Sequence, residues 1–466
     1  MLCGNAVLRS AWGRRGHWGA VAVSSRLDTC KWRSVTCLRI LSSMERVVVF
    51  SSRHSTPDWG FVFNMTSSRA GILGSGEKEP YLEGLRGLAA WVVVVHHFSL
   101  AFLPSIVFTD AIASQHYEWE RFFNASPLYL FFDGNFAVSV FFVLSGYVLT
   151  RKLIDSYDVR VAMRAMVRRY FRLTPPIAVA VFLSYALLSL GLFPTARVAN
   201  ITGSTMWLAT LWNFGPSFSV AFATSFYLVY SQVSSYITVL WSLHFEFLGS
   251  LLSIGASSIS SRPVVRWLGY CALLVFTIRS YFGAMVLGTV LAEFSSLMDK
   301  RLTNSVTSNA SLAIDRGAPV LFFVGLYLGL FPQFGSPHAT TFLLRSIQGV
   351  GIVAVHSIGA LAVVAGLRFS SNLREFFSRD FLKGLGRTSF GVYLVHAIVL
   401  GSLTSWLFLY AWPKFGYGTS ILLACIPSFV LIYFLGKVFA SYIDEPSVRL
   451  SKVISNLIVR KAAISA

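Results

Sequence analysis

Long apolar stretches recur along the chain from Tyr81 onward, whereas residues 1–80 contain none. An α-helix that crosses the hydrocarbon core of a bilayer, about 30 Å thick, needs roughly 17 to 25 mostly apolar residues. Ten stretches have about this length, although two of them are short. Pro and Gly, which favour turns, stand near the ends of several of these stretches. The pattern predicts an all-α, polytopic membrane protein with about ten transmembrane helices, at residues 85–105, 134–153, 174–194, 237–258, 264–279, 281–297, 318–334, 347–368, 386–411 and 418–441.

The same pattern divides the chain into three parts. Residues 1–80 are predicted to be a disordered, basic N-terminal tail, residues 81–450 the membrane domain, and residues 451–466 a short basic cytosolic tail. An Arg-rich, Ser-rich and acid-poor start is also typical of a mitochondrial transit peptide, which is the alternative interpretation of the first part. Residues 204–232 are apolar enough either to cross the membrane or to re-enter it as an interfacial pair.

Composition supports the membrane interpretation and excludes two other classes. Hydrophobic residues make up 55% of the chain, charged residues 13% and aromatic residues 15%, whereas a disordered chain is rich in charge and poor in aromatics. A net charge of +19 would suit a nucleic-acid-binding protein, but the mean hydropathy of +0.63 argues against a water-soluble body. We therefore expect membrane lipid as a partner and no nucleic acid. The five cysteines fit neither a disulfide framework nor a metal site, so no metal is expected.

The basic residues indicate the orientation, because Lys and Arg are retained on the cytosolic side of a membrane. Residues 151–172 contain seven basic and two acidic residues, and residues 368–387 are also predominantly basic. With ten spans, both segments and both termini fall on one side, which we predict to be cytosolic. The protein is expected to be a multi-pass protein of the endomembrane system or the plasma membrane.

Three ionisable residues stand where a bilayer should not tolerate them. Glu246 lies inside an apolar span, and the first span contains Arg86 near its start and His97 near its middle. A charge at that depth costs at least about 2.5–3.5 kcal/mol, so the default interpretation is a functional site that faces the interior of the bundle. The simpler alternatives are that Arg86 is a snorkelling anchor and that the histidine only bonds a neighbouring helix.

These residues suit an acyl transfer from an anionic carrier. Arg86 and His97 are eleven residues apart, about 16 Å along a helix, so a carrier held at Arg86 can present its reactive end to His97. A histidine can take a proton from a hydroxyl, and Glu246 could orient and stabilise it. Because guanidinium groups match phosphate oxygens, a basic cluster would hold the phosphates of acyl-CoA, unless it serves topology alone. The cluster consists of Arg168, Arg169 and Arg172.

Six segments in order resemble the acyltransferase-three family of integral-membrane O-acyltransferases, especially its fungal members. The resemblance covers about residues 81–450. Ser139 stands where many bacterial members have Asp, and the last segment lacks a spacer, so either of its acids could match the family's Glu. The segments are Glu83-Gly-Leu-Arg-Gly-Leu-Ala-Ala with His97, Val138 to Thr150 with its Ser145-Gly pair, Arg168-Arg-Tyr-Phe-Arg172, Leu240-Trp-Ser-Leu-His-Phe-Glu246, Gly386 to His396 and Asp444-Glu445-Pro446.

The resemblance implies an enzyme that transfers acyl groups other than aminoacyl groups, with Arg86 and His97 as main functional residues. We expect O-acylation, with acetyl-CoA as co-substrate and no tightly bound cofactor, and a hydroxyl-bearing small molecule or glycan as acceptor. Fungal members are associated with secondary metabolism. His97 would act as a base, supported by Glu246, or carry the acyl group transiently. Second candidates for orientation or oxyanion contacts are Ser145, Tyr393 and His396.

Two other functions fit some of the same residues. In a proton-coupled transporter or flippase without acyl chemistry, Arg86, His97 and Glu246 would form a relay. In a catalytically inactive structural protein, the same residues would have no chemical role. Consumption of acyl-CoA is what distinguishes the enzyme from both.

Overall fold

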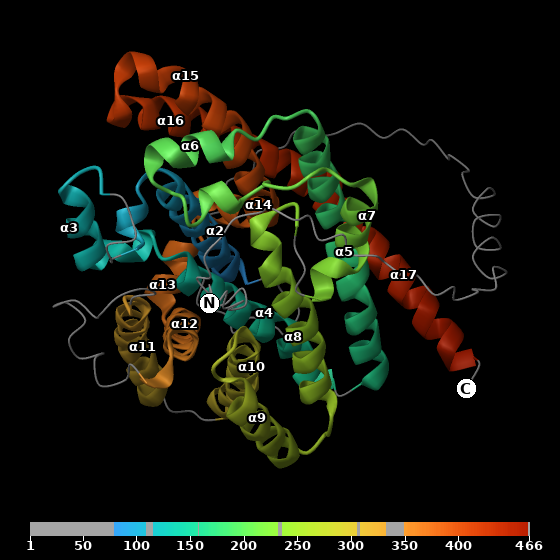
Figure 1. The fold of residues 1–466 in the computed structure, drawn as a ribbon. Coiled ribbons are helices and arrows are strands. Elements are labelled where there is room, and N and C mark those ends of the chain that lie inside the picture. The colour runs from blue at the N-terminus through green and yellow to red at the C-terminus, as the bar shows by residue number, and fades with distance from the viewer. Residues whose placement is uncertain are drawn as a thin grey trace, which may run out of the picture. The chain divides into compact units, whose positions relative to one another are not determined.

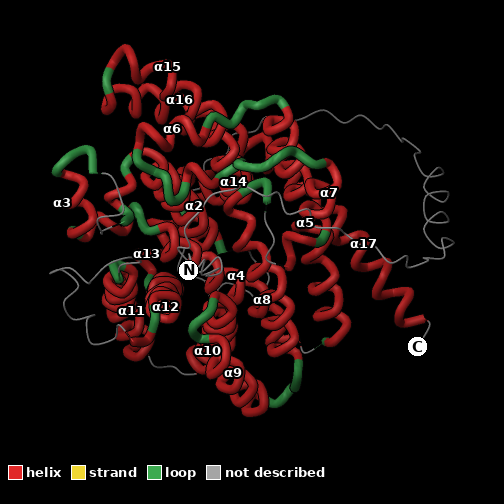
Figure 2. The backbone as a smooth tube through the Cα atoms, viewed as in Figure 1, coloured by secondary structure: helices red, strands yellow, loops and turns green. Residues whose placement is uncertain are grey.

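The computed structural model describes residues 79–108, 115–156, 158–231, 235–304, 308–331 and 349–464. The predicted N-terminal tail lies outside these ranges, except for its last two residues. Within them, every regular element is a helix (Figure 2). The prediction of an all-α polytopic membrane protein is therefore confirmed.

Nine helical segments of the described part are long and apolar enough to cross a membrane (Figure 1). Two of them run on through a π-helical turn: α14 continues through Leu400–Thr404 into α15, and α16 continues through Ala440–Asp444 into α17. The helices are α2 (Pro80–Phe102), α4 (Gly134–Ser156), α5 (Val159–Ser189), α8 (Trp241–Ser258), α10 (Tyr281–Asn304), α11 (Ser308–Gly329), α12 (Ile352–Phe369), α14 (Asp380–Val399), α15 (Ser405–Phe415), α16 (Tyr417–Phe439) and α17 (Glu445–Ile464).

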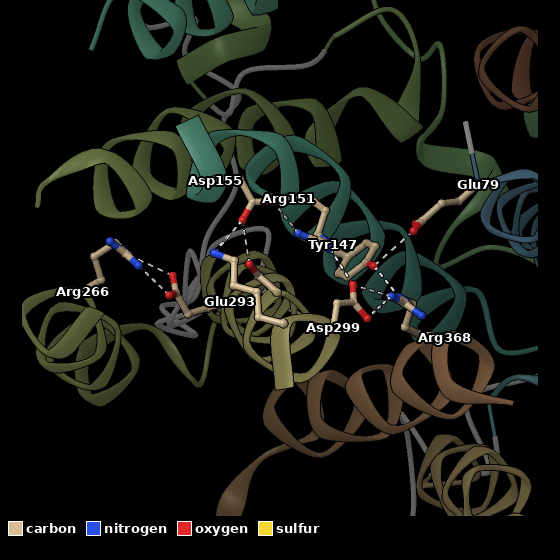
Figure 3. Close-up of polar contacts among 10 residues, drawn as sticks. Glu79, Tyr147, Arg151, Asp155, Arg266, Glu293, Asp299 and Arg368 are labelled. Atoms are coloured by element: carbon tan, nitrogen blue, oxygen red, sulfur yellow. Dashed lines mark hydrogen bonds and ion pairs between the residues drawn. The ribbon is translucent and has the colours of Figure 1, made fainter. Parts of the chain in front are cut away.

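The tenth predicted segment, residues 264–279, is helical but short. It forms α9 (Pro263–Thr277), whose fifteen residues extend about 22 Å, less than the hydrocarbon core. Pro263 begins the helix. Arg266 is fully buried and donates two hydrogen bonds, of 2.9 and 2.6 Å, to the Glu293 carboxylate on α10 (Figure 3). The ion pair between Arg266 and Glu293 therefore ties the short helix α9 to α10.

The uncertain segment 204–232 forms no helix long enough to cross a membrane within its described residues, 204–231. It contains α7 (Phe218–Phe226), nine residues long, together with short 3-10 turns, and follows α6 (Thr195–Thr202). Trp212 anchors it: its ring stacks on Phe193 with centroids 4.1 Å apart, and its Nε1 donates to Ser184 Oγ at 2.9 Å. Trp212 adopts a left-handed φ of 54°, which these contacts hold in place. These short helices favour the re-entrant or interfacial interpretation, and we call residues 204–231 the interfacial segment.

Charged residues join the helices at one end of the bundle (Figure 3). Arg368 on α12 donates to both carboxylate oxygens of Asp299 on α10 at 2.9 Å, and Arg151 on α4 donates to the same carboxylate at 2.7 Å. Tyr147 on α4 accepts from Arg368 at 3.0 Å and contacts Glu79, just before α2 begins, at 3.5 Å. We call this end, where α2 begins, the basic end.

Three further short or terminal elements complete the described chain. The turn between α12 and α14 contains α13 (Ser371–Phe377), and α3 (Trp119–Ala125) precedes α4. Residues 451–464, predicted as a tail, form the larger part of α17, and this helix packs along α5.

Candidate active site

Helix α2 carries Arg86 and His97 on the same face. Eleven residues at about 100° each make three turns and about 20°, so the two side chains are nearly in line, roughly 16 Å apart. Arg86 lies six residues from the start of α2 at the basic end, and His97 lies five residues from its other end. The helix thus spaces a cation and an imidazole along the interior of the membrane domain.

His97 is held by two aromatic rings from other elements. Its Nδ1 lies 3.0 Å from Nε2 of His396 on α14, and its ring stacks on Trp207, with centroids 5.2 Å apart and an angle of 17° between the planes. Trp207 belongs to the interfacial segment that Trp212 anchors. That segment therefore supplies one wall of the His97 site.

The hydrogen-bond partners assign the tautomers of this histidine pair. His396 Nδ1 lies 3.1 Å from the carbonyl oxygen of Val392, which can only accept, so His396 Nδ1 carries the hydrogen. The neutral His396 ring then has its lone pair on Nε2, and His97 Nδ1 must be the donor between the two rings. In this arrangement His97 Nε2 is left with a lone pair, as a general base requires.

His96, the neighbour of His97, has different surroundings. Its Nδ1 lies 2.6 Å from the carbonyl oxygen of Phe132, and its ring packs so closely on Gly134 that a Cβ there would stand 2.7 Å from it. His96 is buried against the turn that begins α4. The two histidines thus point in different directions, as their spacing predicts, and the ring of His97 is the one that meets His396.

Glycines set the register that brings the two rings together. Helices α2 and α14 both begin at the basic end and approach through Gly87 and Gly386: a Cβ on Gly87 would lie 2.7 Å from the Leu385 side chain, and one on Gly386 would overlap the backbone of α2. His97 and His396 each stand ten residues beyond these glycines. Close parallel packing at the basic end therefore aligns the histidine pair further along.

A second group of predicted residues gathers around Glu246. Arg169 on α5 forms an ion pair with Glu246 on α8, and Arg169 Nε also donates to Ser250 Oγ at 3.0 Å. Ser145 on α4 donates to Glu246 Oε1 at 2.6 Å. The side chains of the ion pair are only 7% and 17% exposed, so their charges compensate each other in a dry environment.

Arg86 and Arg172 differ from Arg169 in having no direct partner. Both are half-buried, and within the described ranges neither makes a hydrogen bond or an ion pair. Both interact electrostatically with the Arg169–Glu246 pair and with Asp444, and the strongest charge interaction of Arg86 is with Glu83 on its own helix. Two half-buried guanidinium groups that form no direct ion pair within the described ranges suit an anionic ligand.

Comparison with known proteins agrees with this geometry. A family model described as "Acyltransferase domain", of the acyltransferase-three type, matches residues 79–437. The chain belongs to the acyltransferase-three family. It is 25% identical to the O-acetyltransferase PaAT-1 of Phomopsis amygdali over 69% of this chain and 72% of that protein, and 22% identical to the acyltransferase clz18 of Cochliobolus lunatus over 78% and 93%. It is 28% identical to the acyltransferase R4 of a Phoma species over 28% and 30%. No solved structure matches the chain.

This acyltransferase-three chain therefore divides its predicted site residues between two groups. His97 and His396 form one, and the arginines with Glu246 and Ser145 form the other. Glu246 was expected to support His97, but its contacts are with Arg169 and Ser145, and the atom bonded to His97 Nδ1 belongs to His396.

Two further predicted residues lie close to these groups. Tyr393, one turn before His396, donates to the Val239 carbonyl at 3.0 Å and lies 2.7 Å from Ser242 Oγ, tying α14 to the start of α8. Arg168 is half-buried beside Arg169. Trp207 was not predicted, because a single tryptophan in an aperiodic segment carries no signal in the sequence.

Proposed function

We propose that this membrane acyltransferase is an O-acyltransferase, which moves an acetyl group from acetyl-CoA to a hydroxyl of a small metabolite or carbohydrate. The observation that carries the proposal is the geometry of α2: a histidine whose Nε2 is left with a lone pair stands on the same helix face as the unpaired Arg86. The similarity to a fungal O-acetyltransferase supports acetyl as the group and oxygen as the acceptor.

The donor is proposed to enter from the basic end. The positive-inside rule predicts that this end faces the cytosol, where acyl-CoA is available. The phosphates of the donor would bind Arg86 and Arg172, with Arg168 and Arg169 adding to the positive field. Arg169 already has a partner in Glu246, so we assign it mainly to shaping the site. The thioester would then extend along α2 toward His97.

The chemistry requires one base that later acts as an acid. The acceptor hydroxyl gives its proton to His97 Nε2 while its oxygen attacks the thioester carbon. When the tetrahedral intermediate collapses, the carbon–sulfur bond breaks and His97 returns the proton to the thiolate. The products are the O-acetyl ester and free CoA, and no proton is gained or lost. Throughout, His97 Nδ1–H donates to His396 Nε2, which stabilises the imidazolium that forms on His97.

We propose that acceptor and donor meet in a site that limits the access of water. Trp207 covers one face of the His97 ring, and His97 lies among helices α2 and α14 inside the membrane domain. Exclusion of water limits wasteful hydrolysis of the thioester. Tyr393, near His396 and bonded to α8, is proposed to fix the position of this part of α14.

Release of CoA thiol from acetyl-CoA tests the proposal. Membranes that contain the full chain, supplied with acetyl-CoA and a metabolite extract, should release thiol, and His97→Ala should reduce the rate by about 10²- to 10⁴-fold. His96→Ala is the matched control, because its ring bonds the Phe132 carbonyl and should cost much less. Equal rates for the wild type and His97→Ala, at equal expression, would reject the proposed role of His97. A larger loss in His96→Ala than in His97→Ala would move the base by one residue.

A further inference from the structure

Two neighbouring acids, Asp444 and Glu445, have opposite surroundings. Glu445 begins α17, its side chain is 64% exposed, and its carboxylate lies 3.6 Å from Arg449. Asp444 ends the π-helical turn between α16 and α17, and its Oδ1 is buried without a hydrogen-bond partner among the described residues. The sequence motif leaves open which acid is functional, and the structure separates them.

The π-helical turn Ala440–Asp444 brings Asp444 to the arginine site. This turn packs against α5, which carries Arg172, and against α14. Asp444 interacts electrostatically with Arg172 and Arg86, the two arginines that lack a direct partner. Within the described residues, no ion pair joins Asp444 to either arginine. Local widening of a helix of this kind is frequent at functional sites.

Two arginines and one carboxylate oxygen that interact electrostatically are therefore each without a direct partner among the described residues. A simple anion would satisfy the arginines but would be repelled by Asp444. A ligand that satisfies all three must carry anionic groups together with a polar N–H or O–H that Asp444 can accept. The pantetheine arm of CoA has amide N–H groups and a hydroxyl, and it is joined to phosphates.

We propose that Asp444 Oδ1 accepts a hydrogen bond from an N–H or O–H of the donor's arm, while Arg86 and Arg172 bind its phosphates. Asp444 is thereby a residue that determines donor specificity: it favours acyl-CoA over small acyl donors that lack a polar hydrogen. The inference rests on the proposed function and adds a residue to its donor site.

The sign of the effect on KM distinguishes this bond from simple electrostatics. Removing a negative charge beside two arginines should tighten the binding of any anion, so a purely electrostatic role predicts a lower KM for acetyl-CoA in Asp444→Leu. The proposed hydrogen bond predicts a KM raised by about tenfold, with kcat changed much less. Asp444→Asn keeps an acceptor oxygen and should stay within about threefold of the wild-type KM.

The experiment uses the purified full chain in lipid nanodiscs with acetyl-CoA as the varied substrate. Glu445→Gln, at the exposed neighbour, is the control and should leave KM unchanged. Inhibition by sulfate, an anion without a polar hydrogen, should be at least as strong in Asp444→Leu as in the wild type, which also shows that the arginine site is folded.

Each outcome separates the inference from the proposed function. An unchanged or lowered KM in Asp444→Leu overturns the inference alone, as does a tenfold rise in Asp444→Asn. A wild type that consumes no acetyl-CoA overturns the proposed function together with it.

Discussion

Replacing His396 with leucine tests the histidine pair in isolation from the rest of the site. His396 is fully buried, and leucine fills a similar volume without an acceptor atom. The substitution removes the 3.0 Å bond to His97 Nδ1 and leaves His97 free to adopt either tautomer. The donor site around Arg86 and Arg172 is not touched. We therefore expect kcat to fall while the KM for acetyl-CoA changes little.

The magnitude follows from the change in charge on His97 during the reaction. A net hydrogen bond contributes about 0.5–1.5 kcal/mol between neutral groups and about 1.5–3 kcal/mol when one partner is charged. The bond to His396 is thus stronger by about 1–2 kcal/mol once His97 is an imidazolium. Loss of tautomer preference adds a further few-fold. Because 1.36 kcal/mol corresponds to a factor of ten in rate, kcat should fall by about 10- to 100-fold.

The assay is steady-state CoA release by His396→Leu, His396→Gln, His97→Ala and the double variant, each at matched expression. Glutamine can place an amide oxygen near His97 Nδ1 and should recover most of the loss. A residue that acts only through His97 has no effect once His97 is gone, so the double variant should be no slower than His97→Ala. A wild-type kcat in His396→Leu, or fully additive losses in the double variant, would refute the positioning role.

Two further predictions concern the arginines and the helix contact. Arg172→Gln should raise the KM for acetyl-CoA by about tenfold with little change in thermal stability. Arg169→Gln leaves Glu246 without its arginine partner and should destabilise the protein by about 3–5 kcal/mol, measured by thermal unfolding in detergent. If Arg172→Gln destabilised the protein more than Arg169→Gln, the assignment would be contradicted. Gly386→Ala should lower both thermal stability and kcat, because its Cβ would overlap α2 and disturb the histidine register. Gly384→Ala should resemble the wild type, because an added Cβ there would meet no described atom of another element within 4 Å, and equal behaviour of the two variants would contradict the register argument.

Much of the fold could be predicted from the sequence, because lipid imposes a simple rule on length and polarity. Each of the ten predicted segments contains a helix in its described residues, and nine of these helical segments reach the length of a span. The exception, α9, depends on a buried ion pair between Arg266 and Glu293 that hydropathy cannot reveal. The interfacial segment was ambiguous for the same reason, since Trp212 and its stacking partner, not hydropathy, determine its path.

The candidate site was only partly accessible from the sequence. Spacing on one helix predicts that Arg86 and His97 share a face, because helical geometry is local. It cannot pair His97 with His396, since that contact depends on the parallel packing of α2 and α14 at Gly87 and Gly386. Regular helical spacing also cannot choose between Asp444 and Glu445, because the π-helical turn changes the helix face on which the side chains after it lie.

The fate of a labelled acetyl group tests the central claim most directly. Membranes containing the wild type or His97→Ala would be given acetyl-CoA labelled in its acetyl group, with an extract of candidate acceptors, and the products would be analysed by mass spectrometry. We predict that the wild type forms a product heavier by one labelled acetyl group, held as an oxygen ester, and that His97→Ala does not. Label recovered only as free acetate, or an acetylated product formed equally by both proteins, would contradict the account.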